Sequence, residues 1–498
     1  MRAALLQAGL WVGVLSSAPA WGEASADRFS AGGYLRIMTQ PDFQGGNGQL
    51  GYSNLYGRLL NEGPYAMLQL KLDVIQAAPG SNDAWASVHV RFEGNSVQNA
   101  DGNNGYLNNY NVKELYVRAG NILFDHVTWQ LGTLRYWPGD LGLYDMRPAT
   151  IFDDTVGLSA RYDVGRLELL LGLGDAGYGI HGLQYNSVAS GGGWLRFRAI
   201  PGHLELGGGG QFRYEPSVQG DQYAPYTTPG ITYEEYVRQD VVAKLVEANP
   251  GVASFFPNPI ARSASSYSLF GYLGFGDFGP VVWNNLFARF DKLHPLGPYT
   301  ETFNGQTYPI YITDLTNQRY QALVGDEIQF HLVPGRFDAA WAFLYGHNFN
   351  NANTVAAGFD NFEYGSSVLR LQLYLSDTVH LLLESSVARE VSLNGNLFRL
   401  HQDSIFASSG GLANTQGLEF GDSGTRDTFQ AKAGVVLNPA GPGIYLRPSL
   451  RLLGGLQYST QQAAFGNGFG QSLSQYNVFQ GPERHWHSLV AIEAEEWF

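Results

Sequence analysis

The chain has 498 residues, a net charge of −14, no cysteine and a charged fraction of 15%. The negative charge argues against a nucleic-acid partner, because nucleic-acid-binding domains need a basic surface. The absence of cysteine excludes disulfide bonds and thiolate metal sites. Apart from the N-terminus, no run of about 18 apolar residues occurs, so the sequence argues against membrane-spanning helices.

The N-terminus has the pattern of a secretory signal peptide. Met1 and Arg2 provide a positive start, residues 3–20 are mostly small and apolar, and the sequence APAWG offers small residues for cleavage. The alternative is a buried N-terminal helix. We expect residues 1–22 to be a signal that is removed, which leaves residues 23–498 as the mature protein.

Several stretches alternate between apolar and polar residues with a period of two. In VLRLQLYL (368–375) every second residue from Leu369 is leucine, and the residues between include Arg370 and Gln372. WLRFR (194–198) and YLRPSLRLL (445–453) repeat this pattern. Because side chains alternate across a strand, each stretch has one apolar face and one polar, often cationic face. A soluble β-sandwich would show the same alternation, with its apolar faces turned inward.

The connections between such stretches separate the two architectures. We predict eighteen strands, over residues 29–39, 65–75, 85–95, 112–120, 126–135, 155–163, 166–174, 192–199, 203–213, 266–275, 279–290, 320–331, 335–346, 365–375, 379–389, 425–437, 443–454 and 486–498. After nearly every even-numbered strand the connection is short, as in DVGR (163–166), and it uses turn-forming residues. After odd-numbered strands it is long, as in residues 214–265, which also contain a predicted amphipathic helix.

Short turns at one end and long loops at the other predict an all-β transmembrane antiparallel β-barrel with short periplasmic turns and long extracellular loops. A closed sheet pairs every backbone amide, as the bilayer requires. We therefore expect a bacterial outer-membrane protein whose leucine rows meet outer-membrane lipid and lipopolysaccharide. Its arginine and glutamine rows should line the bore.

Five motifs occur in a recognisable order. They are GGYLR (32–36), RLLNEGPYAMLQLKLDV (58–74), VKELYVRAGNI (112–122), WQLGTLRYWPGDLGLYD (129–145) and the C-terminal EEWF (495–498). In order and spacing they resemble the maltoporin (sugar-porin) family. The resemblance implies an eighteen-stranded, homotrimeric barrel for maltodextrins or other saccharides, with an aromatic slide and a third loop, residues 136–154, folded into the bore.

The resemblance also implies substrate-binding residues. The slide aromatics match Tyr34, Tyr65 and Trp497; channel charges match Arg36, Arg58 and Lys113; constriction carboxylates match Asp140 and Asp145. The alternative for the aromatics is an interfacial girdle, for the cations a solvated lumen, and for the aspartates loop capping. The family's loop arginine and tyrosine fall on Pro138 and Arg147, and a strand glutamate falls on Met67. These departures alter the constriction and put a preference for maltodextrins in doubt.

Three other functions stay open. Inward arginines suggest a channel for acidic polysaccharide or other anions; they are Arg196, Arg198, Arg370, Arg447 and Arg451. An outer-membrane enzyme would need a catalytic constellation, but GDSG (421–424) and HWH (485–487) lack diagnostic spacing. An adhesin would use the long loops and a sealed bore. We expect no enzyme activity, cofactor or metal.

Overall fold

The computed structural model describes residues 28–41, 43–44, 54–78, 81–95, 109–181, 187–216, 263–294, 299–303, 306–310, 319–350, 361–393, 424–462, 464–466, 468–469 and 483–498. Its strands are β1 (Phe29–Thr39), β2 (Tyr65–Ile75), β3 (Trp85–Asn95), β4 (Asn109–Gly120), β5 (Val127–Tyr136), β6 (Ile151–Asp163), β7 (Leu167–Asp175), β8 (Ala189–Ile200), β9 (Leu204–Glu215), β10 (Ala264–Phe278), β11 (Val281–Lys292), β12 (Tyr299–Phe303), β13 (Gln306–Ile310), β14 (Arg319–Val333), β15 (Phe337–Asn350), β16 (Phe362–Tyr374), β17 (Val379–Ser392), β18 (Thr425–Leu437), β19 (Ser449–Ser459) and β20 (Trp486–Trp497). Within the described ranges two short helices have bounds, the 3-10 helix η2 (Asn54–Tyr56) and α2 (Gly177–His181).

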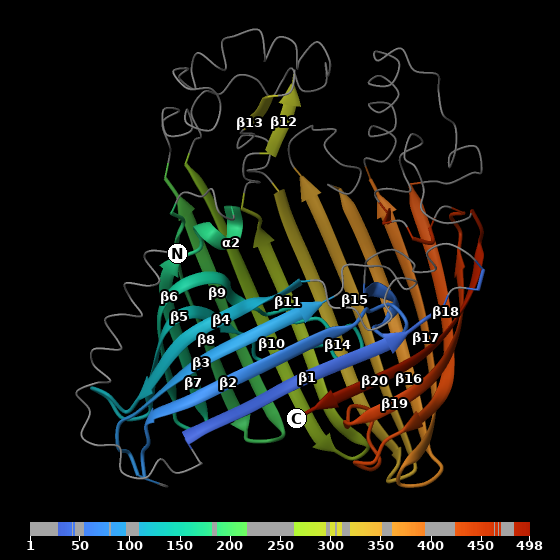
Figure 1. Ribbon diagram of the computed structural model, residues 1–498, viewed down its shortest axis with the longest axis horizontal. Coiled ribbons are helices and arrows are strands. Elements are labelled where there is room, and N and C mark those ends of the chain that lie inside the picture. Colours follow the sequence, from blue (N-terminus) through green and yellow to red (C-terminus); the bar gives the residue numbers. More distant parts are fainter. Residues whose placement is uncertain are drawn as a thin grey trace.

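Eighteen of these strands form one antiparallel sheet that closes into a barrel (Figure 1). Each strand pairs with its neighbour in the chain, and β20 returns to pair with β1. At this seam Tyr34 lies opposite Trp497, and Thr39 lies opposite Ile492. The remaining pair, β12 and β13, forms a separate hairpin. The predicted fold class is confirmed: the closed sheet leaves no unpaired edge, as a spanning sheet must.

The predicted strands correspond one to one with the strands of the barrel, with one large error in position. Residues 443–454 were expected to form the seventeenth strand, but β19 begins at Ser449 and ends at Ser459. Pro448 stands immediately before it. Proline has no amide hydrogen to donate to a ladder, so it favours a strand boundary over a strand interior.

The connections are sorted by end as predicted. Short turns such as those between β6 and β7 and between β16 and β17 lie at one end of the barrel, and the connections at the other end are long (Figure 1). The β12–β13 hairpin belongs to one of the long connections and was not predicted. The helix predicted within residues 214–265 and the signal peptide predicted at residues 1–22 lie outside the described residues.

The strands turn their apolar rows outward. Along β17 burial alternates with every residue: Leu383 is 56% exposed on the outer face, and the adjacent Glu384 is 2% exposed on the inner face. The same holds in β16, where Leu373 is exposed and Arg370 is buried. This is the reverse of a soluble sandwich and suits a barrel in lipid. No helix in the described part of the chain is long and apolar enough to cross a membrane.

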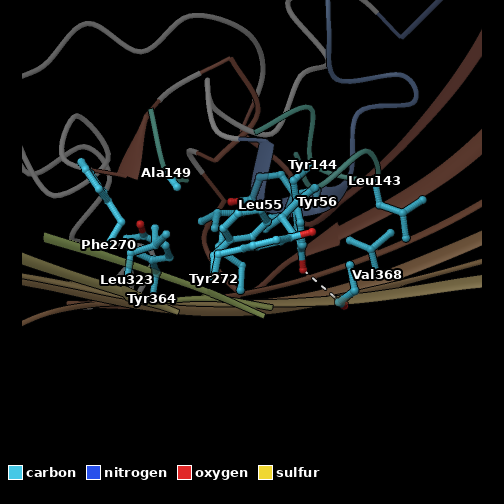
Figure 2. Packing of buried hydrophobic residues seen from close by; sticks show 14 of the residues in the cluster. Leu55, Tyr56, Leu143, Tyr144, Ala149, Phe270, Tyr272, Leu323, Tyr364 and Val368 are labelled. Carbon is cyan, nitrogen blue, oxygen red and sulfur yellow. Dashed lines mark hydrogen bonds between the residues drawn. The ribbon is translucent and has the colours of Figure 1, made fainter. Parts of the chain in front are cut away.

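Two of the long connections pack inside the barrel. Leu55 and Tyr56, from the connection between β1 and β2, share one buried cluster with Leu143 and Tyr144, from the connection between β5 and β6. Figure 2 shows these side chains gathered beside residues of the barrel wall such as Tyr364. The bore is therefore partly filled by the chain itself.

Residues 54–62 attach firmly to the wall formed by β16 to β20. Leu59 and Leu60 are buried in a second apolar cluster with residues of β17 to β20, among them Leu382. The Lys432 ammonium donates to the Tyr56 carbonyl at 2.9 Å, and the Asn61 amide donates to Gln430 at 3.1 Å. We call residues 54–62 the inner segment. Its apolar and polar contacts together hold it against this wall.

Candidate solute-binding cavity

A cavity of about 1030 Å³ occupies the open side of the bore. It lies between the β20–β1–β2 wall, the inward part of the β5–β6 connection, and the facing strands β11 and β14. Its lining is mixed aromatic and charged: Tyr34, Arg58, Tyr65, Met67, Arg91, Glu93, Arg135, Asp140, Gly142, Asp145, Met146, Arg147, Thr150, Trp283, Asn285, Glu327, Gln329, Tyr445, Arg447, Glu495 and Trp497.

Three aromatic rings form a continuous strip along one wall of the cavity. The ring centroids of Tyr34 and Tyr65 are 5.8 Å apart, and those of Tyr34 and Trp497 are 4.5 Å apart. The strip arises because the three residues occupy inward positions on the adjacent strands β2, β1 and β20, whose register places Tyr34 opposite Trp497. The Trp497 side chain is 57% exposed, and its ring is open to the cavity.

One buried carboxylate fixes this wall. Glu495, on the inward face of β20, accepts a hydrogen bond from the Tyr34 hydroxyl at 2.6 Å and pairs with Arg58 of the inner segment. Its second oxygen lies 2.7 Å from both Arg447 and Arg451. A carboxylate that satisfies several donors keeps its charge when buried. Glu495 therefore anchors the aromatic strip and the inner segment to the same point of the barrel.

The β5–β6 connection forms the facing side of the cavity. The Leu143 amide donates to the Glu327 carboxylate of β14 at 2.8 Å, and the Asn285 amide of β11 donates to the Asp140 carbonyl at 3.1 Å. Ser366 of β16 donates to the Tyr144 hydroxyl at 2.9 Å. Residues 140–144 are thus tied to three strands of the wall, which holds the side chains of this loop against the bore.

Arg36 and Arg147 make different kinds of contact in this region: Arg36 forms ion pairs, and Arg147 stacks on an aromatic ring. Arg36 of β1 pairs with Glu62, and its guanidinium lies 3.8 Å from Asp145. The Arg147 guanidinium stacks on the Trp137 ring, 4.3 Å from its centroid, and no described carboxylate lies within ion-pair distance of it. Burial raises the pKa of Glu62 to about 7, against the opposing effect of Arg36, and burial also raises the pKa of Asp140.

The structure brings together most of the residues that the sequence indicated. Six of the eight line the cavity, namely Tyr34, Arg58, Tyr65, Asp140, Asp145 and Trp497. Arg36 is not among the lining residues of the cavity and pairs with Glu62. Lys113 lies apart: it is exposed at a β-bulge in β4, where the ladder passes from Glu114 to Val112.

Sequence reasoning missed Glu62, Glu327, Tyr445 and Glu495. Glu495 could have been assigned to the bore from the alternation of β20, which puts Val490 and Ile492 outside. Glu62 and Tyr445 lie in connections between strands, and Glu327 of β14 accepts a hydrogen bond from such a connection. The alternation of residues within strands does not predict the path of a connection. The Tyr445 hydroxyl, for example, donates to Glu327 across the bore.

The arginines that suggested an anion channel are paired with carboxylates. Arg370 lies 2.6 Å from Glu384. The other four pair with acidic residues of the same or neighbouring strands: Arg196 and Arg198 with Glu168, and Arg447 and Arg451 with Glu495. Each of these five cations therefore has an acidic partner inside the barrel, and Glu168 and Glu495 are each shared by two of them.

The described residues contain no group of three or more histidine and acidic side chains placed to hold a metal ion. Most of the GDSG sequence, residues 421–423, lies outside the described residues, so the structure places no serine there. His487 is buried on the inner face of β20, beside the Phe465 ring.

The closed barrel, the outward apolar rows and the sorted connections define a β-barrel protein of the bacterial outer membrane. No protein-family model and no curated protein matches the chain.

Solved structures of outer-membrane barrels resemble the chain over most of its length. The outer membrane channel DcaP of Acinetobacter baumannii has 7% identity and a TM-score of 0.43, and the match covers 94% of this chain and 97% of that one. OprD of Pseudomonas aeruginosa has 9% identity and a TM-score of 0.41, covering 94% and 95%. Wzi of Escherichia coli, a carbohydrate-binding β-barrel involved in capsule assembly, has 11% identity and a TM-score of 0.38, covering 94% and 85%. At these scores the likeness is coarse, and the ligands of these proteins do not carry over to this chain.

Proposed function

We propose that the protein is a porin through which saccharides diffuse along the aromatic strip. The observation that carries the proposal is the row of rings Tyr65, Tyr34 and Trp497 along a cavity of about 1030 Å³. Tyr65 begins β2 at the long-loop end, and Trp497 ends β20 at the short-turn end. A solute that moves from ring to ring would therefore progress toward the periplasm.

Sugars fit this surface because they present two kinds of face. Their C–H faces pack on aromatic rings, and their hydroxyls exchange hydrogen bonds with charged groups. Here the rings lie beside Arg58 and Glu495, and Asp140 and Arg147 stand on the facing side. Neighbouring rings offer similar contacts, so a sugar can move from one ring to the next without leaving a site of much stronger binding. Binding at each step has to be weak enough for release, as in any conducting pore.

Liposome swelling tests this function. Vesicles that contain the folded protein should swell in isotonic glucose or maltose and should not swell in a large dextran. A Trp497→Ala variant should change the order of rates among sugars more than it changes the rate for a small polyol such as glycerol. Protein-loaded vesicles that swell no faster than empty ones would contradict the proposal.

The maltoporin resemblance supports a homotrimer in contact with lipopolysaccharide. The outer rows of leucine provide apolar area for both lipid and a second copy of the chain. Chemical cross-linking in outer-membrane vesicles should give a trimer band that persists after heating, whereas protein without cross-linker should run as a monomer after heating. A species that remains monomeric at all cross-linker concentrations would contradict the trimer.

Removal of residues 1–22 belongs to the same proposal, because an outer-membrane protein has to be exported. The intact mass of the protein purified from outer membranes should match a chain that begins near residue 23. A mass equal to that of the full 498 residues would contradict it.

A further inference from the structure

A second, smaller cavity of about 270 Å³ lies along the inner face of β3 to β7. It is lined by Trp85, Arg118, Thr128, Gln130, Leu134, Arg135, Tyr136, Phe152, Ser159, Arg161, Asp163 and Leu170. Trp85 begins β3, Arg118 is near the end of β4 and Asp163 ends β6, so one end of the cavity lies near the short turns. Tyr136 ends β5 and Phe152 is near the start of β6, so its other end lies at the β5–β6 connection. Arg135 lines both cavities, so the two are neighbours inside the barrel.

Arg118 differs from the other arginines of this cavity. Arg135 lies 2.6 Å from Asp153, and Arg161 lies 2.9 Å from Glu168. No described carboxylate lies within ion-pair distance of the Arg118 guanidinium, which contacts the Gln130 side chain and the face of the Tyr116 ring. Arg118 is thus a cation in the lumen whose charge has no carboxylate partner within the described chain.

The contacts of Arg118 hold it in one orientation. Its Nε donates to the Gln130 side-chain oxygen at 2.8 Å, and Gln130 is fixed in turn by donating to the Thr133 carbonyl at 2.7 Å. The guanidinium carbon lies 4.8 Å from the centroid of the Tyr116 ring. An arginine held through its Nε keeps its terminal nitrogens available for the two oxygens of a carboxylate.

A flat aromatic surface lies in the same cavity. Trp85 pairs directly with Gly120 across β3 and β4, and a Cβ atom added at Gly120 would stand 2.2 Å from the indole nitrogen. The missing side chain allows the indole to lie against the backbone of β4. Trp85 is half-buried and contributes to the cavity lining together with Arg118.

We propose that this cavity binds a single sugar ring that carries a carboxylate, with the carboxylate on Arg118 and the ring on Trp85. The proposal rests on the porin function proposed above, and it narrows the solute to acidic saccharides such as uronates. The volume supports one ring rather than a chain, since pockets for drug-sized ligands run from about 300 to 1,000 Å³. The larger cavity would then accept the chain and the smaller one its acidic end.

Planar-bilayer recordings with glucuronate added on the short-turn side test the site. Glucuronate should reduce the wild-type current more strongly than glucose or acetate, because only glucuronate offers both a ring and a carboxylate. In Arg118→Gln the glucuronate concentration for half-block should rise about tenfold, the loss expected for one hydrogen bond to a charged group. The half-block concentration for glucose should stay within twofold.

Arg336→Gln is the matched control. Arg336 is an exposed arginine in the short turn between β14 and β15 and lines neither cavity. It should leave the glucuronate block unchanged. Trp85→Leu gives a second variant that keeps all charges, and it should weaken the block by glucuronate but not the weak effect of acetate.

The outcomes separate the two proposals. Failure of the wild-type protein to conduct, or to respond to any sugar, would overturn the porin function. Conductance with sugar block, but equal glucuronate block in wild type, Arg118→Gln and Arg336→Gln, would overturn the acidic-sugar site alone. Equal block by glucuronate and acetate would overturn the role of Trp85.

Discussion

Tyr34 and Trp497 face each other across the seam where the last strand of the barrel closes on the first, with ring centroids 4.5 Å apart. The same two residues therefore lie at the junction that closes the sheet and also line the larger cavity. Because Tyr34 also donates to Glu495 at 2.6 Å, its ring is held at a fixed angle to the wall. A fixed ring binds a flat solute at a lower entropic cost than a mobile one.

Replacing Trp497 by alanine should weaken the block of ion current by saccharides by about two- to thirteenfold, the equivalent of about 0.5–1.5 kcal/mol for one aromatic contact. Trp341→Ala is the control, because Trp341 is 45% exposed on the outer face of β15. Equal loss of block in both variants, measured by titrating maltose or glucuronate in planar bilayers, would show that Trp497 acts through stability rather than contact.

Glu62 predicts a pH dependence of ion selectivity. Its pKa is raised from 4.5 to about 7 by burial, and it pairs with Arg36, whose guanidinium also lies 3.8 Å from the cavity residue Asp145. As the pH falls through about 7, Glu62 loses its negative charge, so the preference for cations should decrease. Over that pH range, the reversal potential in a salt gradient should shift toward the equilibrium potential of the anion in wild type. It should not shift in Glu62→Gln.

The same group predicts the direction of a stability change. A carboxyl whose pKa is higher in the folded state than in the unfolded state binds more protons when folded. Its stabilising contribution is complete below about pH 4.5 and is lost as the pH rises through about 7. Denaturant titrations in detergent should show wild type losing stability over this range relative to Glu62→Gln. A loss of equal size in both would assign the effect to other groups.

The inner segment should behave as a fixed part of the barrel. Leu59 is buried among residues of β17 to β20, so Leu59→Ala should destabilise the protein by about 2–5 kcal/mol and loosen the segment. Single-channel currents should become noisier and larger on average. Leu383→Ala, on the outer face, is the control and should leave the current unchanged. Quiet, unaltered currents in Leu59→Ala would mean that the segment does not restrict the bore.

The leucines on the outer face of the barrel predict that the energetic cost of introducing a charge there depends on its depth in the bilayer. Leu383 lies within β17 and Leu437 ends β18 at the turn side, and both are exposed on the outer face. Leu383→Arg should cost about 2–4 kcal/mol of folding free energy in lipid vesicles, and Leu437→Arg about 0–1 kcal/mol. Urea titrations of tryptophan fluorescence measure both. Equal costs would contradict a bilayer that covers the middle of β17.

The strands and their faces could be read from the sequence because each depends on neighbours two residues apart. Leu369 and Arg370 take the faces that their alternation predicts. The failure at residues 443–454 came from counting Arg447 and Pro448 as strand, although proline favours a strand boundary. Lys113 was indicated by the resemblance alone, and a bulge in β4 leaves it exposed and away from the cavity.

The connections could not be predicted in the same way. Burial of Tyr56 depends on Glu390 and Arg426, which are more than 300 residues away in the chain, and no local pattern records those contacts. The ion pair between Glu495 of β20 and Arg58 of the inner segment is likewise a long-range contact. The resemblance to sugar porins indicated six cavity residues, but the inward path of residues 54–62 came from long-range packing.

Single-channel recording of the purified, folded protein in a planar bilayer tests whether the bore conducts ions and binds sugars. We expect stepwise ion currents that saccharides reduce in a saturable way, with a weaker effect in Trp497→Ala. A folded barrel that inserts into the bilayer and yet passes no current, or passes a current that no sugar affects, would contradict this expectation.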